Sequence, residues 1–432
     1  MSLEAKATRG GARRGLAARI GLRRMGWAAM VASLALVAAA CGSTATTKAP
    51  AKKSPTGVTV PNLSINSFTL NFSAMTQLKG LQAAGKGLVG AILPDTTSST
   101  RYTEFDAPYL TKAFQMAGYP SSAFTVTNAQ GSDATELSMA ESDITKGAKV
   151  LIVDPLDPTV ASEIQAYASA HGVALISYDR ATFAGTNTYY VSFNNYRVGQ
   201  LIGKGFEACV TAWHVAHPQV WEVDGGENSD PNAISFAQGY NSVIWGTKKT
   251  PLTAPMTNSL GYHLVGDQVT LNWDVATAGT NFAQALTAHP NINAVVVAND
   301  EMNANVVQDL KNKGVKPFTV PTTGQDATLT GMENILDGYQ CGTVYKPIYL
   351  EAQAAVALAT ILRAGKTPPS ALVNSTTVDP ANSSITEPAS LLTPEWVTPS
   401  NMQATVIKDK FIQASQLCSA VGQSVCTKYG IS

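Results

Sequence analysis

The chain contains little charge. Charged residues make up 14% of its 432 residues, and 30 basic residues balance 30 acidic ones. That balance hides an asymmetry, because residues 1–40 hold seven of the basic residues and one of the acids. Without this segment 23 basic and 29 acidic residues remain, a net charge of −6. Such a chain lacks the clustered Lys and Arg that neutralise phosphates, which argues against a nucleic-acid-binding protein.

Motifs of catalysis and metal binding are also missing. The sequence has no G-x-S-x-G, Walker A or H-E-x-x-H pattern, no C-x-x-C, and five scattered His. It therefore predicts no catalytic residue, no metal site and no cofactor. One G-x-G-x-x-G occurs at 85–90. Its glycines enter an expected strand instead of following one, so it does not fit a dinucleotide-binding turn.

No apolar run is long enough to suggest a transmembrane span. The run Trp27 to Ala40 is shorter than the about 20 residues that are needed to span a bilayer. It follows a basic segment, and this order is typical of a signal peptide, which we expect over 1–40. It ends in Ala-Ala-Ala-Cys-Gly, which resembles the bacterial lipobox, so we expect Cys41 to carry lipid. Ordinary secretion with cleavage nearby is the alternative. Residues 41–85 are expected to form a tether and an N-terminal extension.

Four cysteines remain after Cys41, an even number that suggests disulfides in an exported chain. Cys418 and Cys426 are separated by seven residues, and we expect them to form a short-loop disulfide. Cys209 and Cys341 could form a second disulfide, across the hinge of the two-lobe fold inferred below. The sequence does not decide whether they pair.

From about residue 86 short apolar runs alternate with amphipathic stretches. A helix is marked between two of the runs by Asp157 as N-cap, Pro158 at its first position and Gly172 after its end. Another is expected over 133–147. The expected strands of this half are 88–93, 124–127, 149–153 and 173–176.

The same alternation restarts after a helix around 198–209. The expected strands of the second half are 220–223, 262–265, 294–298 and 318–320. The pattern predicts an α/β fold with two doubly wound parallel-sheet lobes. Ligands of such sheets bind at the carboxyl ends of the strands, so we expect a site in the cleft between the lobes.

Carboxylates follow several of these strands, at Asp95, Asp179 and Asp326. Two of them could form a glycosidase pair. Neighbouring cations argue otherwise, because they lower the pKa that the general acid needs raised. Arg beside Asp instead makes a forked array of donors and acceptors, which suits the hydroxyls of a small sugar.

Several segments resemble the periplasmic D-xylose-binding proteins of bacterial ABC transporters. The matching segments, in order along about 86–412, are 177–180 (SYDR), 190–195 (YVSFNN), 198–199 (VG), 299–300 (ND), 324–326 (GQD), 343–347 (TVYKP), 391–394 (LLTP) and 406–409 (VIKD). The resemblance implies a type I periplasmic-binding-protein fold with two lobes joined by a three-strand hinge.

The resemblance also implies domain boundaries. The N-terminal lobe is expected to comprise 86–208 with about 348–365, and the C-terminal lobe 219–343 with about 366–412. Residues 413–432 would form a C-terminal tail. Residues 58–85 and this tail have no counterpart in the family.

The sugar-contacting positions of the family fall on eight residues of this chain. They are Arg101, Asp179, Arg180, Asn232, Trp273, Asn299, Asp326 and Lys346. Trp273 would cover an apolar face of the ring, and the others would bind hydroxyls. Two departures are the loop before Arg101, which is one residue longer, and Pro231 before Asn232.

Each of these residues also has an ordinary structural explanation. Asp179 and Arg180 could form a surface ion pair, Trp273 could be core, and Lys346 could be solvated. Asn299 and Asp326 could simply serve turns at strand ends.

The expected function is that of a binding protein, not an enzyme. A lipid-anchored monomer outside the cytoplasmic membrane would deliver a monosaccharide, D-xylose first, to an ABC-type permease. Another sugar or a glycosidase is the alternative. A sugar-responsive regulator would need an N-terminal helix-turn-helix where this chain has an export signal.

Overall fold

The computed structural model describes residues 57–185, 187–226 and 230–432. The expected signal peptide and Cys41 therefore lie outside the described residues. Within those ranges no helix is long and apolar enough to cross a membrane.

The first lobe is built on a seven-stranded sheet in the order β11-β12-β5-β4-β3-β1-β2. All its strand pairs are parallel except β11 with β12. The strands are β1 (Leu88–Leu93), β2 (Phe124–Asn128), β3 (Ala148–Val153), β4 (Ala174–Tyr178), β5 (Thr188–Phe193), β11 (Ser375–Val378) and β12 (Thr386–Leu392).

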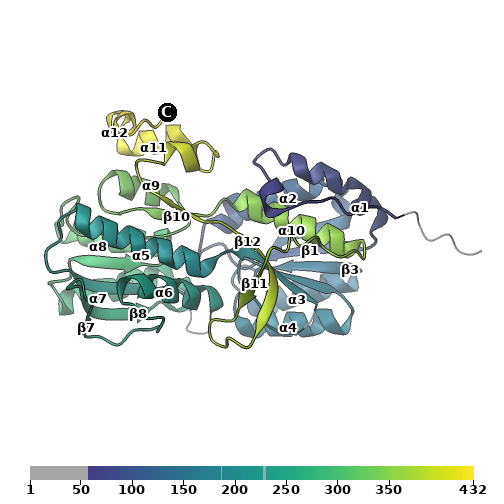
Figure 1. Cartoon of the computed structure of the whole chain (residues 1–432), viewed down its shortest axis with the longest axis horizontal. Coiled ribbons are helices and arrows are strands. Elements are labelled where there is room, and N and C mark those ends of the chain that lie inside the picture. The colour runs from purple at the N-terminus through teal and green to yellow at the C-terminus, as the bar shows by residue number, and fades with distance from the viewer. Residues whose placement is uncertain (1–56, 186, 227–229) are drawn as a thin grey trace, which may run out of the picture. The chain divides into compact units, whose positions relative to one another are not determined.

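Helices cover both faces of this sheet (Figure 1). One face carries α1 (Lys79–Ala84), α2 (Ala107–Met116) and α10 (Ile348–Arg363), and the other carries α3 (Asp133–Thr145) and α4 (Pro158–Ala170). The predicted cap of α4 is present, since the Asp157 carboxylate accepts hydrogen bonds from the amides of Thr159 and Val160.

The segment before β1 is folded into the first lobe. Phe72, Met75 and Leu78 are fully buried in the cluster that contains α2 and α10. This part of the expected N-terminal extension therefore completes the core of the lobe and is no tether.

The second lobe has a four-stranded sheet in the order β7-β8-β6-β9. Its elements are α5 (Asn195–Ala212), β6 (Gln219–Asp224), α6 (Pro231–Ile244), β7 (Met256–Thr257), β8 (His263–Val269), α7 (Val275–Ala288), β9 (Ala294–Val297), α8 (Asp300–Asn312), α9 (Leu329–Leu336), β10 (Thr343–Tyr345) and β13 (Glu395–Val397). The predicted strand at 318–320 is wrong. Instead, the following residues hydrogen-bond to β9 and β10 without forming a strand. The Val295 amide donates to the Pro321 carbonyl, and the Val344 amide donates to the Gly324 carbonyl.

Two predicted lobe boundaries need correction. The predicted boundaries place most of α5 in the first lobe, but its buried Val198, Ile202 and Phe206 share a core with the second sheet. Conversely, they place β11 and β12 in the second lobe, but β12 pairs with β5. The lobes therefore change over near Asn194 and near Leu392.

The chain crosses between the lobes three times, which agrees with the implied three-connection hinge. The crossings lie between β5 and α5, between β10 and α10, and between β12 and β13. The second crossing contains Lys346 and Pro347.

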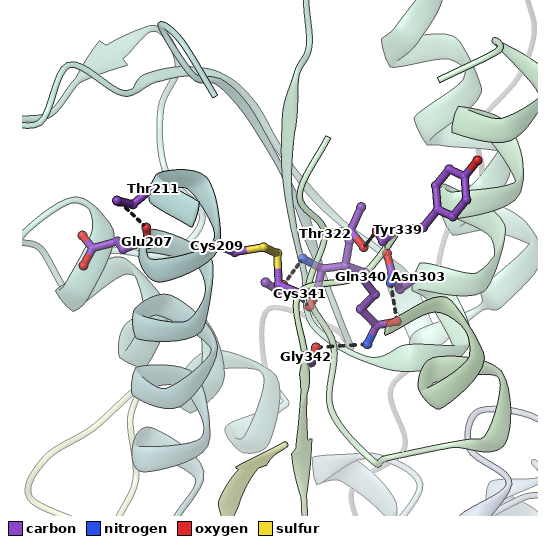
Figure 2. The surroundings of a disulfide bond; sticks show 11 residues. Glu207, Cys209, Thr211, Asn303, Thr322, Tyr339, Gln340, Cys341 and Gly342 are labelled. Atoms are coloured by element: carbon purple, nitrogen blue, oxygen red, sulfur yellow. Dashed lines mark hydrogen bonds between the residues drawn. A yellow bond between two sulfur atoms is a disulfide. The ribbon is translucent and has the colours of Figure 1, made fainter. Parts of the chain in front are cut away.

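A disulfide joins Cys209 of α5 to Cys341 just before β10 (Figure 2). Both cysteines lie in the second lobe, so the bond forms but does not span the hinge, which corrects the sequence-based expectation. It ties α5 to the strand that leads into the second crossing. Beside it the Gln340 amide donates to the carbonyl of Gly342 and accepts from Asn303.

The C-terminal tail folds onto the second lobe. Helices α11 (Ala414–Val421) and α12 (Gln423–Lys428) are joined by a disulfide between Cys418 and Cys426. Leu417 and Ile431 are buried in the core of that lobe. The tail is thus part of the folded unit.

Candidate functional site

All eight residues predicted to touch a ligand line one narrow cavity between the lobes, with a solvent-accessible volume of about 30 Å³. Ser98, Ser99, Tyr102, Asp230, Phe236 and Gln325 complete its wall. A wider cleft of about 880 Å³ shares Ser98, Arg180, Asp230 and Trp273 with this cavity. The small cavity therefore lies next to an open approach between the lobes.

Arg101 organises the first-lobe side. Its guanidinium is buried and pairs with Asp106 at 2.9 Å, Asp179 at 2.8 Å and Glu351 at 2.6 Å. Four of its five N–H donors are used in these bonds, which leaves one on Nη1. Arg101 therefore mainly positions Asp179, and it can offer a ligand a single hydrogen bond.

Asp179 carries a charge at the cavity wall. Burial alone would raise the pKa of this carboxyl, but Arg101, Lys346 and Arg180 hold it below its ordinary value. An ionised Asp179 with Arg101 beside it accepts hydroxyl donors well.

Arg180 lines the same wall with fewer fixed bonds. One of its terminal nitrogens donates to the carbonyls of Pro155 and Leu156, and the other donates to the hydroxyl of Tyr102. Its Nε lies 3.8 Å from Asp154, a long ion pair. Burial and the proximity of Asp179 raise the pKa of Asp154. Arg180 therefore remains able to donate toward the cavity.

Asn232 lies on the second lobe at the start of α6, where Asp230 is the N-cap and Pro231 the first helical residue. This position tolerates proline, so the departure at Pro231 does not disturb the helix. The Asn232 amide donates to the Asp179 carbonyl at 3.1 Å, and its oxygen accepts from Asn195 at 2.8 Å. In this structure Asn232 thus joins the two lobes directly.

Lys346 and Asp326 form an ion pair of 2.7 Å on the second-lobe side, with both side chains buried. The ammonium also lies 5.8 Å from the centre of the Phe236 ring. Burial alone would lower the pKa of Lys346, but Asp326 and Asp179 raise it above its ordinary value. Lys346 is therefore charged, and two of its three donors remain for other partners.

Asn299 is the N-cap of α8, where its oxygen accepts from the Met302 amide at 3.0 Å. Asn299 lines the cavity, and no described residue accepts a hydrogen bond from its amide nitrogen. The carboxylate of the next residue, Asp300, accepts hydrogen bonds from the Gln340 amide nitrogen at 2.7 Å and from the Thr343 hydroxyl at 3.0 Å. Burial raises the pKa of Asp300 to about 7.

Trp273 forms an aromatic wall of the cavity. Its indole N–H donates to Asp230 at 2.9 Å, and its ring meets Phe236 edge-on at 6.1 Å. A Cβ on Gly225 would overlap this ring, so only glycine leaves room for it.

Three of the eight residues have left-handed backbone. The φ angles are +58° at Asp179, +56° at Trp273 and +88° at Asp326. Such conformations are costly for residues other than glycine and persist where the surroundings impose them, often at functional sites. Here they aim three side chains from three different loops into one cavity.

The sequence did not predict a role for Glu301, which contacts Ser99 in the cavity wall. Glu301 follows Asn299 and Asp300 on α8, and its Oε1 accepts from the hydroxyl of Ser99 and the amide of Thr100 in the other lobe. Burial, and then Asp326 and Asp300, raise its pKa to about 8. Nothing in the local sequence marks it, because its partners lie about 200 positions away.

The comparisons with known proteins agree with this architecture. A family model for the periplasmic binding protein domain matches residues 89–367. The D-xylose-binding periplasmic protein of Escherichia coli (strain K12) is 33% identical over 68% of this chain and 82% of the relative. The chain belongs to the periplasmic binding protein family.

Other members of the family show the same relationship. The multiple sugar-binding periplasmic receptor ChvE of Rhizobium radiobacter is 30% identical over 78% of this chain and 93% of the relative. A carbohydrate transporter solute-binding protein from Chloroflexus aurantiacus, solved in complex with D-glucose, has a TM-score of 0.64 at 27% identity. The structural alignment covers 76% of this chain and 98% of the Chloroflexus aurantiacus protein.

Family membership settles the class of activity. The periplasmic binding proteins bind solutes for transport, and this chain is a binding protein, not an enzyme. The predicted two-lobe type I fold is confirmed.

Proposed function

We propose that this protein captures a monosaccharide outside the cytoplasmic membrane and delivers it to an ABC-type permease. The observation that carries the proposal is the pairing of charges on both lobes around one cavity. Arg101 and Asp179 come from the first lobe, while Asp326 on the second lobe pairs with Lys346 in the hinge. Paired charges present both donors and acceptors at little net charge, which suits a neutral polyol more than an acid or a phosphate.

Capture would proceed by closure of the lobes around the hinge. The contact between Asn232 and the Asp179 carbonyl joins the lobes at the cavity itself. A sugar bound to both sides would stabilise this contact and so favour the closed form. The closed form would then dock on the permease.

D-xylose is the first candidate for the sugar. Support comes from the D-xylose-binding relatives in Escherichia coli and Haemophilus influenzae, both 33% identical. A hexose is the second candidate, because ChvE is a multiple sugar-binding receptor and the Chloroflexus aurantiacus protein was solved with D-glucose.

Calorimetry on the purified protein tests the proposal. We expect one-to-one binding of D-xylose and a melting temperature that rises with xylose concentration. Binding of a hexose but not of xylose would reject the pentose and keep the transport role. No binding of any pentose, hexose or disaccharide would reject the sugar class.

We also propose that the protein is anchored through lipid on Cys41. This residue lies outside the described ranges, and the proposal rests on the sequence Ala-Ala-Ala-Cys-Gly after an apolar segment. Cells that express the protein should incorporate a fatty-acid analogue into it. Equal labelling of a Cys41→Ala variant would contradict the anchor.

A further inference from the structure

Three carboxylates that do not line the sugar cavity meet inside the second lobe. Glu222 and Asp224 point to the same side of β6, and Asp267 lies opposite Glu222 on the neighbouring parallel strand β8. One carboxylate oxygen of each residue lies within 4.8 Å of the others. Glu222 is fully buried, and Asp224 is 3% exposed.

Hydrogen-bond donors hold these carboxylates, and Asp224 and Asp267 also share a hydrogen bond, which requires a proton on one of them when no cation is bound. The indole of Trp245 donates to Glu222 at 2.6 Å, the Tyr240 hydroxyl donates to Asp224, and the Leu252 amide donates to Asp267. Among the residues that the structure describes, no Lys or Arg forms an ion pair with any of the three.

Apart from the contact between the two aspartates, two oxygens of this cluster accept no hydrogen bond from any described residue. They are Oε2 of Glu222 and Oδ1 of Asp267, and both are buried. A buried carboxylate oxygen without a donor is costly, and the cost grows beside two further acids. Burial and the neighbouring acids accordingly raise the pKa of Glu222.

Either protons or a cation can balance such a cluster, and one cation would contact all three carboxylates, including the Glu222 oxygen that no described donor reaches. Three oxygens about 4 Å apart lie on the shell of one ion at about 2.4 Å, the Ca²⁺–oxygen distance, and these three, which lie within 4.8 Å of one another, would reach that shell after a small inward shift. Mg²⁺ needs a tighter octahedron, and an all-oxygen donor set does not select zinc or copper. The surrounding donors would fix the carboxylate orientations as a supporting shell.

We propose that Glu222, Asp224 and Asp267 bind a divalent Ca²⁺ ion that stabilises the second lobe. The ion would hold the end of β6 against β8. Gly225 follows Asp224 directly and supports the Trp273 ring, and the Asp224 carbonyl accepts from the Thr270 amide. The cation would therefore also steady the loop that carries Trp273. Motif-based reasoning cannot find this site, because its ligands lie on two strands 43 positions apart.

The first test uses the wild-type protein and the metal alone. The purified protein is unfolded in denaturant with EDTA, to release a buried ion, and is refolded with or without Ca²⁺. We expect a higher melting temperature with Ca²⁺ and one equivalent of retained metal by elemental analysis. The rise should be larger at pH 8 than at pH 5, because protons compete for the carboxylates.

A second test uses luminescence. Tb³⁺, which replaces Ca²⁺ at oxygen sites, should emit on indole excitation because Trp245 donates directly to Glu222. Glu222→Gln and Asp224→Asn should abolish the emission, while Asp337→Asn, which changes an exposed acid of the same lobe, should leave it unchanged.

Three results would overturn the proposal. The first is a melting temperature that responds to neither EDTA nor Ca²⁺ at pH 8. The second is the absence of retained metal. The third is Tb³⁺ emission that persists in both variants, which would place the ion at an adventitious site. The wild-type measurements decide the question even if a variant fails to fold.

Discussion

Ser99 and Glu301 meet across the two lobes, where the serine hydroxyl donates to the glutamate at 2.9 Å. The amide of Thr100 donates to the same oxygen at 3.2 Å. Ser99 belongs to the loop after β1, and Glu301 lies in the first turn of α8. These bonds require the two lobes to be together, so Glu301 would favour the closed form proposed above without lining the cavity.

Closure should therefore depend on pH through Glu301. In the closed form burial, with Asp326 and Asp300, raises its pKa to about 8, whereas an exposed glutamate titrates near 4.3. Between these values the closed form binds more protons than the open form, so sugar affinity should fall as pH rises from about 5 to 8. One linked proton changes the affinity by at most about tenfold per pH unit.

The Glu301→Gln variant tests this dependence. Glutamine still accepts from Ser99 and Thr100 but does not titrate, so its affinity should vary less with pH and should exceed that of the wild type at pH 8. Glu301→Ala should bind more weakly than Glu301→Gln at every pH. Calorimetry from pH 5 to 8 measures the sugar affinity of each protein. If the affinities of the wild type and Glu301→Gln change with pH in parallel, the mechanism is contradicted.

Asp179→Ala should weaken sugar binding strongly. It removes the acceptor at the cavity wall and leaves a donor of the buried Arg101 without its partner. The loss of a hydrogen bond to a charged group costs about 1.5–3 kcal/mol, or roughly tenfold or more in affinity. Glu163→Ala, which removes an exposed acid of the same lobe, is the matched control. Equal affinities of the two variants by calorimetry would exclude Asp179 from the site.

The sequence was sufficient to predict the regular parts of the fold. Strands of the first lobe and the cap at Asp157 follow from apolar runs and local hydrogen bonding, which depend on near neighbours. The eight residues of the cavity were found through the family resemblance, because each follows a strand or hinge motif of fixed order. Their strained backbone and exact hydrogen bonds had no sequence signal.

Features that depend on distant contacts were missed. The periodicity of α5 predicts a helix but does not say which lobe it joins, which is decided by its close packing on α6 through Gly199 and Gly203. Strand β11 is mostly exposed and rich in Thr. It therefore lacks the apolar run or the apolar–polar alternation from which its pairing with β12 could be predicted. The contact of Ser99 with Glu301 joins residues 202 positions apart.

Removal of the C-terminal disulfide should destabilise the tail. Cys418 and Cys426 are eight positions apart, and a closed loop of this size corresponds to about 2–3 kcal/mol of unfolding free energy in the chain-entropy model. We expect a double Cys→Ser variant to melt at lower temperature while its sugar affinity stays close to that of the wild type, because the tail lies against α9. Reduced affinity with an unchanged melting temperature would contradict this separation.

Gly225→Ala should displace Trp273 from the cavity. Gly225 does not have the positive φ that disfavours alanine, so the obstacle is the indole ring, which the new methyl group would overlap. We expect a loss of about tenfold or more in sugar affinity and a smaller change of tryptophan fluorescence when sugar is added. Gly80→Ala is the control, since its methyl group would meet only Val58 at 3.5 Å. If Gly225→Ala does not fold, Trp273→Ala tests the same wall directly. Affinity retained in both variants would show that Trp273 is core and makes no stacking contact with the sugar.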